Sequence, residues 1–142
     1  MKKSFVFLVV LVFLLISCAS AVKISVEEEN YPKIIAEKAY NEFGKNYKNA
    51  IAYYQYIIDN FDRDNYAKDV AWAYYEIGFC YYYQNKYEEA LKYFNIVINN
   101  FTVLPPRILA QKVMQDIYEK KPKLKPLEVI EEEANTEENI DS

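Results

Sequence analysis

The chain has 142 residues, of which 52% are hydrophobic and 17% aromatic, and its formal net charge is −4. This length suits one modest domain, and the negative charge makes nucleic acid a poor partner because phosphate groups would be repelled. With no histidine and two glycines in the sequence, a phosphate-binding glycine loop, a Cys–His pair and a histidine-based metal site are excluded. We therefore expect a protein that is not an enzyme, with no catalytic residue, no metal and no cofactor.

The first predicted element is a secretory signal peptide over residues 1–17. Lys2 and Lys3 give it a positive start, and an unbroken apolar run follows from Phe5 to Ile16. A bilayer-spanning helix needs roughly 20 apolar residues, so this run is too short to be one. A basic start followed by a short apolar run is typical of a removable signal and is left out of the fold prediction.

The end of that run, LISC at residues 15–18, resembles the lipobox of bacterial lipoproteins. The resemblance implies that Cys18 becomes the first residue of the mature chain and carries a diacylglycerol and an N-acyl lipid, and several acyl chains anchor a protein stably. Ala19 follows, not the aspartate that commonly retains such lipoproteins in an inner membrane, so the resemblance favours the outer membrane and its periplasmic face. The alternative is an ordinary cleaved signal with a chance cysteine.

Polar segments flank the predicted domain. Residues 18–30 are predicted to be the acylated cysteine and a tether. At the other end, prolines interrupt regular structure from Pro122 onward, and the acidic sequence that follows predicts a disordered tail over residues 122–142. With Cys18 acylated, Cys80 is left as a single thiol in an apolar stretch, where a free cysteine usually behaves as a small buried hydrophobic residue.

Residues 31–121 contain an internal repeat. The segment 46–61 aligns without a gap on the segment 86–101, at an offset of 40. In both, the apolar positions step i, i+4, i+7, i+8, i+11, which is one face of an α-helix. Each segment follows another apolar helical stretch across a tight turn, so the pattern predicts helix–turn–helix twice. A fifth helix, near residues 106–118, carries apolar residues expected on one face: Ile108, Leu109, Val113 and Ile117.

The second copy resembles the tetratricopeptide repeat, with signature positions at Tyr74, Ile77, Gly78, Tyr81, Tyr87, Ala90, Phe94 and Val97. We expect Gly78 and Ala90 to lie where two antiparallel helices press closely together, because glycine in a helix interior costs about 1 kcal/mol and needs a packing reason. Larger side chains should fill the space beside that contact: Tyr74, Ile77, Tyr81 and Phe94, with Ala50 and Tyr54 as the equivalents of Ala90 and Phe94 in the first copy. The predicted fold is all-α: about five helices, or two and a half tetratricopeptide-like repeats, in a short solenoid. The segment Asp62–Asp69 is expected to lengthen the link between the repeats.

The helix that contains AWAYYEIGFCYYY has a second apolar face, made by Trp72, Tyr75, Phe79, Tyr82 and Tyr83. In tetratricopeptide arrays the corresponding face points to neighbouring first helices and to the groove that binds peptides or partner helices. Tyrosine and tryptophan are also common at interface hot spots. The alternative is that these rings pack on the flanking helices. We expect part core and part partner-binding groove.

The lipobox, the short tether and the helical pattern of residues 36–101 together resemble the BamD family, outer-membrane lipoproteins of the β-barrel assembly machinery. That resemblance implies an accessory scaffold whose partners are a β-barrel assembly protein and unfolded outer-membrane proteins. The family has about five repeats, whereas two and a half are predicted here. Two other roles stay open: a periplasmic adaptor that coordinates wall synthesis or division with the envelope, and a surface-displayed structural lipoprotein.

Overall fold

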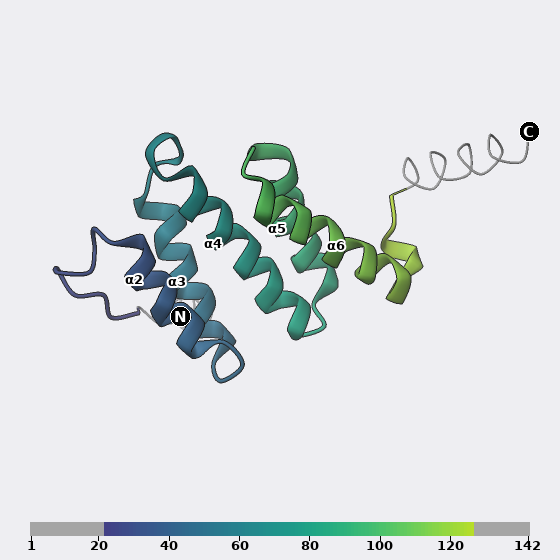
Figure 1. Ribbon diagram of the computed structural model, residues 1–142. Coiled ribbons are helices and arrows are strands. Elements are labelled where there is room, and N and C mark those ends of the chain that lie inside the picture. Colours follow the sequence, from purple (N-terminus) through teal and green to yellow (C-terminus); the bar gives the residue numbers. More distant parts are fainter. Residues whose placement is uncertain (1–21, 127–142) are drawn as a thin grey trace, which may run out of the picture.

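The computed structural model describes residues 22–126, and the regular structure in that range is helical (Figure 1). The α-helices in chain order are α2 (Pro32–Glu42), α3 (Tyr47–Asn60), α4 (Arg63–Tyr83), α5 (Tyr87–Asn100) and α6 (Leu104–Lys120), and the short 3-10 helix η1 (Pro122–Leu124) follows. The predicted signal peptide, Cys18 and most of the acidic tail lie outside the described residues.

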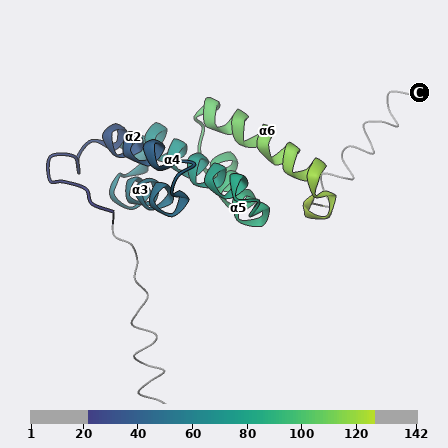
Figure 2. The ribbon, with the colours of Figure 1, turned by 90° about the horizontal axis from the view of Figure 1, so that it is seen from below.

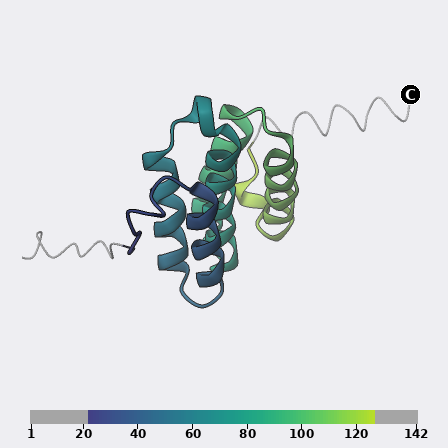
Figure 3. The same ribbon diagram turned by 60° about the vertical axis from the view of Figure 1, so that its left-hand side comes forward.

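The helices pack as antiparallel neighbours in sequence order, α2 with α3, α4 with α5, and α6 against α5. Figure 2 shows α2 and α6 on one side of the stack and α3 and α5 on the other. In Figure 3 the purple and blue helices of the first pair lie at one side and α6 lies at the opposite side. The prediction of an all-α, tetratricopeptide-like solenoid with two and a half repeats is confirmed. The repeat offset is confirmed as well, since α3 and α5 begin 40 residues apart and each has 14 residues.

Two helix starts are stabilised by N-terminal caps. The side chain of Asn46 accepts a hydrogen bond from the backbone N–H of Asn49, at 3.2 Å, at the start of α3. The Asp62 carboxylate accepts the backbone N–H groups of Asp64 and Asn65, at 2.7 and 3.2 Å, at the start of α4. Asparagine and aspartate are favoured at these positions because they satisfy N–H groups that have no partner within the helix.

Both tight turns inside the helix pairs use a residue with positive φ. Gly44 has φ 77° between α2 and α3, and Asn85 has φ 59° between α4 and α5. Glycine adopts this left-handed conformation without steric cost, and asparagine tolerates it better than most other residues. The tight turns predicted from the sequence therefore lie where expected.

Helix α4 is the central element. It packs most extensively against α3 and α5 and also contacts α2 and α6. The buried side chains form two cores that meet at this helix: Val70, Ala73 and Ile77 belong to the core with α2 and α3, whereas Tyr75 belongs to the core with α5 and α6. A helix that is apolar all round is one that is covered on several sides. This explains why the sequence of α4 has apolar residues on two faces.

One prediction about the link between the repeats is wrong. The segment Asp62–Asp69 does not form an extended connection, because α4 begins at Arg63 and only Tyr66, with φ −121° and ψ 29°, departs from helical geometry. The Arg63 guanidinium lies 5.5 Å from the ring centroid of Tyr74 and 5.1 Å from that of Phe101. Cation–π contacts of this kind attach the added turn to the body of the domain. The longer repeat spacing is therefore taken up by a longer helix.

The ends of the domain also differ from the predicted boundaries. Residues 26–30, expected to be tether, form turns, and Glu28 makes an ion pair with Lys38 of α2. The hydrogen bond from Lys38 holds the pKa of Glu28 down to about 2. At the other end, Pro122–Leu124 forms η1, so the first residues assigned to the tail are ordered.

Helix α6 uses a different face from the predicted one. Ile117 is buried and Val113 half-buried, but Ile108 is 58% exposed and Leu109 is 38% exposed. The helix packs through another set of residues: Pro106, Ala110, Met114 and Ile117. Within residues 22–126 only α5, η1 and part of α4 lie against α6, so one of its two apolar stripes is left uncovered there.

Candidate functional site

Most of the residues predicted to pack within the repeats are buried. Tyr74 and Tyr81 are half-buried, and the remaining six are buried: Ala50, Tyr54, Ile77, Gly78, Ala90 and Phe94. A Cβ atom added at Gly78 would lie 2.8 Å from Cε1 of Phe94. Gly78 therefore makes room for an aromatic ring of α5, which is a more specific role than the general helix–helix approach expected from the sequence.

Four of the five predicted groove residues form a continuous row of rings on α4, which we call the aromatic row: Trp72, Tyr75, Phe79 and Tyr82. Successive ring centroids are 5.6, 5.6 and 6.0 Å apart, within the range that aromatic pairs prefer. Tyr75 is only 6% exposed, and burial raises the pKa of its hydroxyl to about 12. Tyr75 therefore belongs to the core and offers no groove surface, because α5 and α6 cover it.

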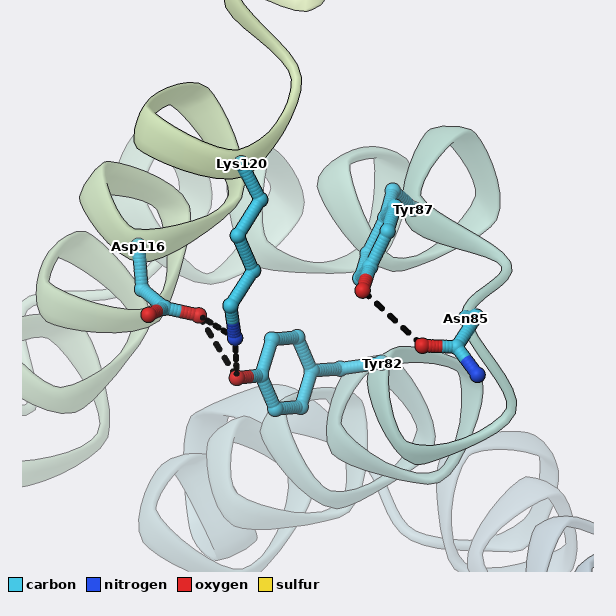
Figure 4. A network of polar contacts seen from close by, with 5 residues as sticks. All are labelled: Tyr82, Asn85, Tyr87, Asp116 and Lys120. Atoms are coloured by element: carbon cyan, nitrogen blue, oxygen red, sulfur yellow. Dashed lines mark hydrogen bonds and ion pairs between the residues drawn. The ribbon is translucent and has the colours of Figure 1, made fainter.

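Tyr82 connects α4 to α6 (Figure 4). Its hydroxyl donates a hydrogen bond to Asp116, at 2.6 Å, and accepts one from the Lys120 ammonium, at 2.7 Å, while Lys120 and Asp116 form an ion pair. The hydrogen bond from Lys120 lowers the pKa of Asp116, and the hydrogen bond to Asp116 raises that of Lys120. Tyr82 is thus occupied by contacts within the chain.

Phe79 and Tyr83 pack against Phe43, the C-cap residue that follows α2. The ring of Phe43 stacks on that of Phe79 at 5.8 Å and meets that of Tyr83 edge to face at 5.3 Å. Phe79 is half-buried in this group, whereas Tyr83 is 52% exposed. Of the five predicted groove residues, Tyr83 therefore presents the most accessible aromatic surface.

Trp72 lines a pocket of about 260 Å³ between α2 and α4, which we call the α2/α4 pocket. Its walls come from three helices and include Pro32, Ala36, Tyr54, Ile57, Trp72 and Glu76. Burial raises the pKa of the Glu76 carboxyl from 4.5 to about 7, because a low-dielectric environment disfavours the charged form.

Glu76 is the site residue that the sequence analysis did not single out. It is the one charged residue in the stretch from Ala71 to Tyr83, and it follows Trp72 by one helical turn. A single acidic residue in an otherwise uncharged helix segment is the signal that could have identified it, because an unpaired charge is rarely placed on a packed face.

Two larger hollows of about 650 and 670 Å³ flank η1. One lies beside Met114 and Tyr118 of α6, and the other beside Lys86 and the lysines that follow α6.

Among residues 22–126 there is no group of His, Cys, Asp and Glu side chains that could hold a metal ion. No helix in the same range combines the length and apolar character needed to cross a membrane. The free thiol of Cys80 is buried, and burial raises its pKa to about 12.

Comparison with known proteins finds one family model that matches part of the chain. The sequence profile described as tetratricopeptide repeat matches residues 71–99, which cover most of α4 and nearly all of α5. No curated protein and no solved structure matches the chain. The matched segment is the helix pair that contains Gly78 and the Phe94 ring that lies against it. The chain therefore carries a tetratricopeptide repeat, an element that mediates protein–protein interaction, over residues 71–99 of an all-helical solenoid.

Proposed function

We propose that this protein is a lipid-anchored, non-catalytic adaptor of the cell envelope that receives a protein partner on the face formed by α2 and α4. The observation that carries the proposal is the accessible surface there: the α2/α4 pocket lies on the same helix as the exposed ring of Tyr83. Aromatic side chains beside a pocket are typical of the anchor points of protein interfaces.

A second observation supports a partner at the end of the stack. The exposed stripe on α6 includes Leu104, which is 64% exposed, and Ile108. Repeat arrays normally cover their last helix with a capping element that has a polar outer surface, and within residues 22–126 η1 is the only element beyond α6. A bound protein would shield these side chains from water.

The finer assignment rests on the sequence resemblance. We propose that the lipid is attached to Cys18, that it holds the protein at the periplasmic face of the outer membrane, and that the role is an accessory one in β-barrel protein assembly. The partners would then be a β-barrel assembly protein and unfolded outer-membrane proteins. The wall-synthesis or division adaptor and the surface-displayed lipoprotein are the alternatives that the experiment must separate.

The test is site-specific photocrosslinking in cells that express the full chain. A photoreactive phenylalanine analogue replaces Tyr83, and the matched control replaces Asn95, an exposed residue of α5. We expect a discrete crosslinked protein from position 83 and none from position 95. Equal crosslinking from both positions, or none from position 83, would contradict docking on the α2/α4 face.

The identity of the crosslinked protein tests the finer assignment. A β-barrel assembly protein, identified by mass spectrometry, would support the accessory role in barrel assembly. A wall enzyme or a division protein would favour the adaptor of wall synthesis. Cleavage by protease added to intact cells would place the domain on the outer surface and contradict the periplasmic location.

A further inference from the structure

Glu76 and Tyr54 both line the α2/α4 pocket, and neither side chain has a polar partner in the described part of the chain. The carboxylate of Glu76 forms neither a hydrogen bond nor an ion pair there, and the hydroxyl of Tyr54 forms no hydrogen bond. Tyr54 is only 4% exposed, but its hydroxyl oxygen is not among the buried side-chain atoms without a partner in residues 22–126, so this oxygen is still accessible to solvent. Two accessible acceptors that line one pocket and have no partner within residues 22–126 leave room for an external donor.

The charge of the pocket indicates what kind of donor fits. Burial raises the pKa of Glu76, and no ion pair within residues 22–126 offsets the cost of its negative charge. Burial and the Glu76 charge together raise the pKa of Tyr54, so its hydroxyl stays neutral close to the carboxylate. A cation placed beside Glu76 would recover the free energy that burial of an unpaired carboxylate costs.

The walls fit the stem of a long basic side chain. Ala36, Ile57 and the ring of Trp72 provide apolar surface, along which the methylene groups of lysine or arginine can lie. A tryptophan face also attracts a cation. The volume, about 260 Å³, is below the range of roughly 300–1,000 Å³ usual for small-molecule sites, so one inserted side chain fits better than a cofactor.

The cations of the domain itself do not neutralise Glu76. Lys33 lines the mouth of the pocket, together with Asp69, but it is exposed and makes no ion pair with Glu76. The ion pairs found within residues 22–126 are those of Lys38 with Glu28 and of Lys120 with Asp116. Within residues 22–126 no cation pairs with Glu76, so its carboxylate is available to a cation from another molecule.

We propose that the α2/α4 pocket binds a lysine or arginine side chain of the protein partner, with Glu76 as the counter-ion and the Tyr54 oxygen as a second acceptor. The inference rests on the proposed function, in which this face receives a protein, and it adds the chemistry of the contact. An ammonium donates to both acceptors, whereas a guanidinium can pair with the carboxylate through two parallel hydrogen bonds.

Trp72 makes the test direct, because it is the single tryptophan of the chain. The full-length protein in detergent is titrated at constant ionic strength with N-acetyl-lysine methylamide and with N-acetyl-arginine methylamide, and tryptophan emission is recorded. N-acetyl-norleucine methylamide is the control probe, because it has a stem of similar length and no charge. We expect saturable changes with the cationic probes and about tenfold weaker binding of the uncharged one, as for loss of a charged hydrogen bond. The stronger cationic probe identifies the preferred head group.

The variant Glu76→Gln keeps the size of the side chain and removes its charge. We therefore expect the affinity for the cationic probes to fall about tenfold and the affinity for the uncharged probe to stay the same. The matched control Glu37→Gln removes an exposed carboxylate of α2 and should bind like the unmodified protein. Equal binding of the norleucine probe, unchanged binding in Glu76→Gln, or no saturable response to any probe would overturn the inference.

The two proposals fail in different ways. Crosslinks from position 83 together with a negative titration would support protein docking on the α2/α4 face and contradict the proposed site for a basic side chain. A positive titration without crosslinks would retain the cation site and remove the proposed docking function.

Discussion

Replacing Glu76 with glutamine should make the protein more stable, which is unusual for a substitution at a partly buried position. The fold places this carboxyl in the α2/α4 pocket, where no ion pair compensates its charge. Glutamine is nearly the same size and carries no charge, so it keeps the packing and removes the desolvation cost. The gain should depend on pH, because only the ionised carboxylate is destabilising.

The magnitude follows from the pKa of Glu76, which burial raises from 4.5 to about 7. Each tenfold change in proton affinity corresponds to about 1.4 kcal/mol, so the ionised carboxylate costs the folded state roughly 3 kcal/mol, or about 2 kcal/mol once its partial exposure to water is considered. Between these two pKa values the folded state binds a proton that the unfolded state has released. The free energy of unfolding therefore falls as pH rises through this range and stays low above it.

The assay is thermal unfolding followed by circular dichroism, with the unmodified protein and Glu76→Gln compared at about pH 4.5 and about pH 8. We expect nearly equal melting temperatures at the lower pH. At the higher pH the melting temperature of the variant should be about 10 °C above that of the unmodified protein, since 1 kcal/mol shifts the melting temperature of a domain this small by roughly 4–8 °C. Other titratable side chains around Glu76 are Lys33, Tyr54, Asp69 and Cys80, and they are the same in both proteins.

Glu37→Gln is the control, because Glu37 is exposed on α2 and its replacement changes the net charge by the same amount. Its melting temperature should follow that of the unmodified protein at both pH values. A Glu76→Gln difference that does not change with pH, or a variant less stable than the unmodified protein at about pH 8, would refute the reasoning. Either result would mean that Glu76 has a partner in solution or that water solvates its carboxylate as well in the folded state as in the unfolded state.

Three further predictions concern packing, docking of the last helix and the membrane anchor. Gly78→Ala should lower the free energy of unfolding by about 1 kcal/mol, because overpacking against the Phe94 ring exceeds the gain in helix propensity. This loss of stability, measured by urea unfolding, should be smaller in a Phe94→Leu background. The loss caused by the control Gly44→Ala, where nothing lies within 4 Å of the added Cβ, should be the same in both backgrounds. Tyr82→Phe removes the hydrogen bonds that join α4 to α6, so amide hydrogen exchange in α6 should become faster, and unchanged exchange would show that apolar packing alone holds α6. Cys18→Ala should leave the chain unprocessed or release it from the membrane fraction on cell fractionation, and unchanged retention together with normal processing would exclude the proposed lipid anchor.

Much of the fold followed from periodicity and turn chemistry. The repeat at an offset of 40 predicted that α3 and α5 are equivalent helices of two repeats, and the residues of the turns were consistent with positive φ at Gly44 and Asn85. These features are local: a helical face, a cap and a turn each depend on residues within about one or two turns of helix. The sequence also indicated correctly that Cys80 is a buried free thiol.

The accessibility of the aromatic residues could not be predicted in the same way. Spacing placed Tyr75, Phe79 and Tyr82 on one face of the helix, but it did not show which of them a neighbouring helix covers. The position of α6 decided this: it contributes to the core that buries Tyr75, and it holds Tyr82 through Asp116. Exposure depends on contacts between residues that are far apart in the sequence.

The sequence by itself determined that the chain forms helix pairs, where they turn, and which small residues lie between them, because these are consequences of helical period and side-chain size. Only the tertiary structure decided that α4 separates two cores, that Gly78 accommodates the ring of Phe94, and that Glu76 lines a pocket without a counter-ion. The physical reason is that burial and electrostatic environment are set by every helix that surrounds a residue, whereas periodicity describes only the helix on which it lies.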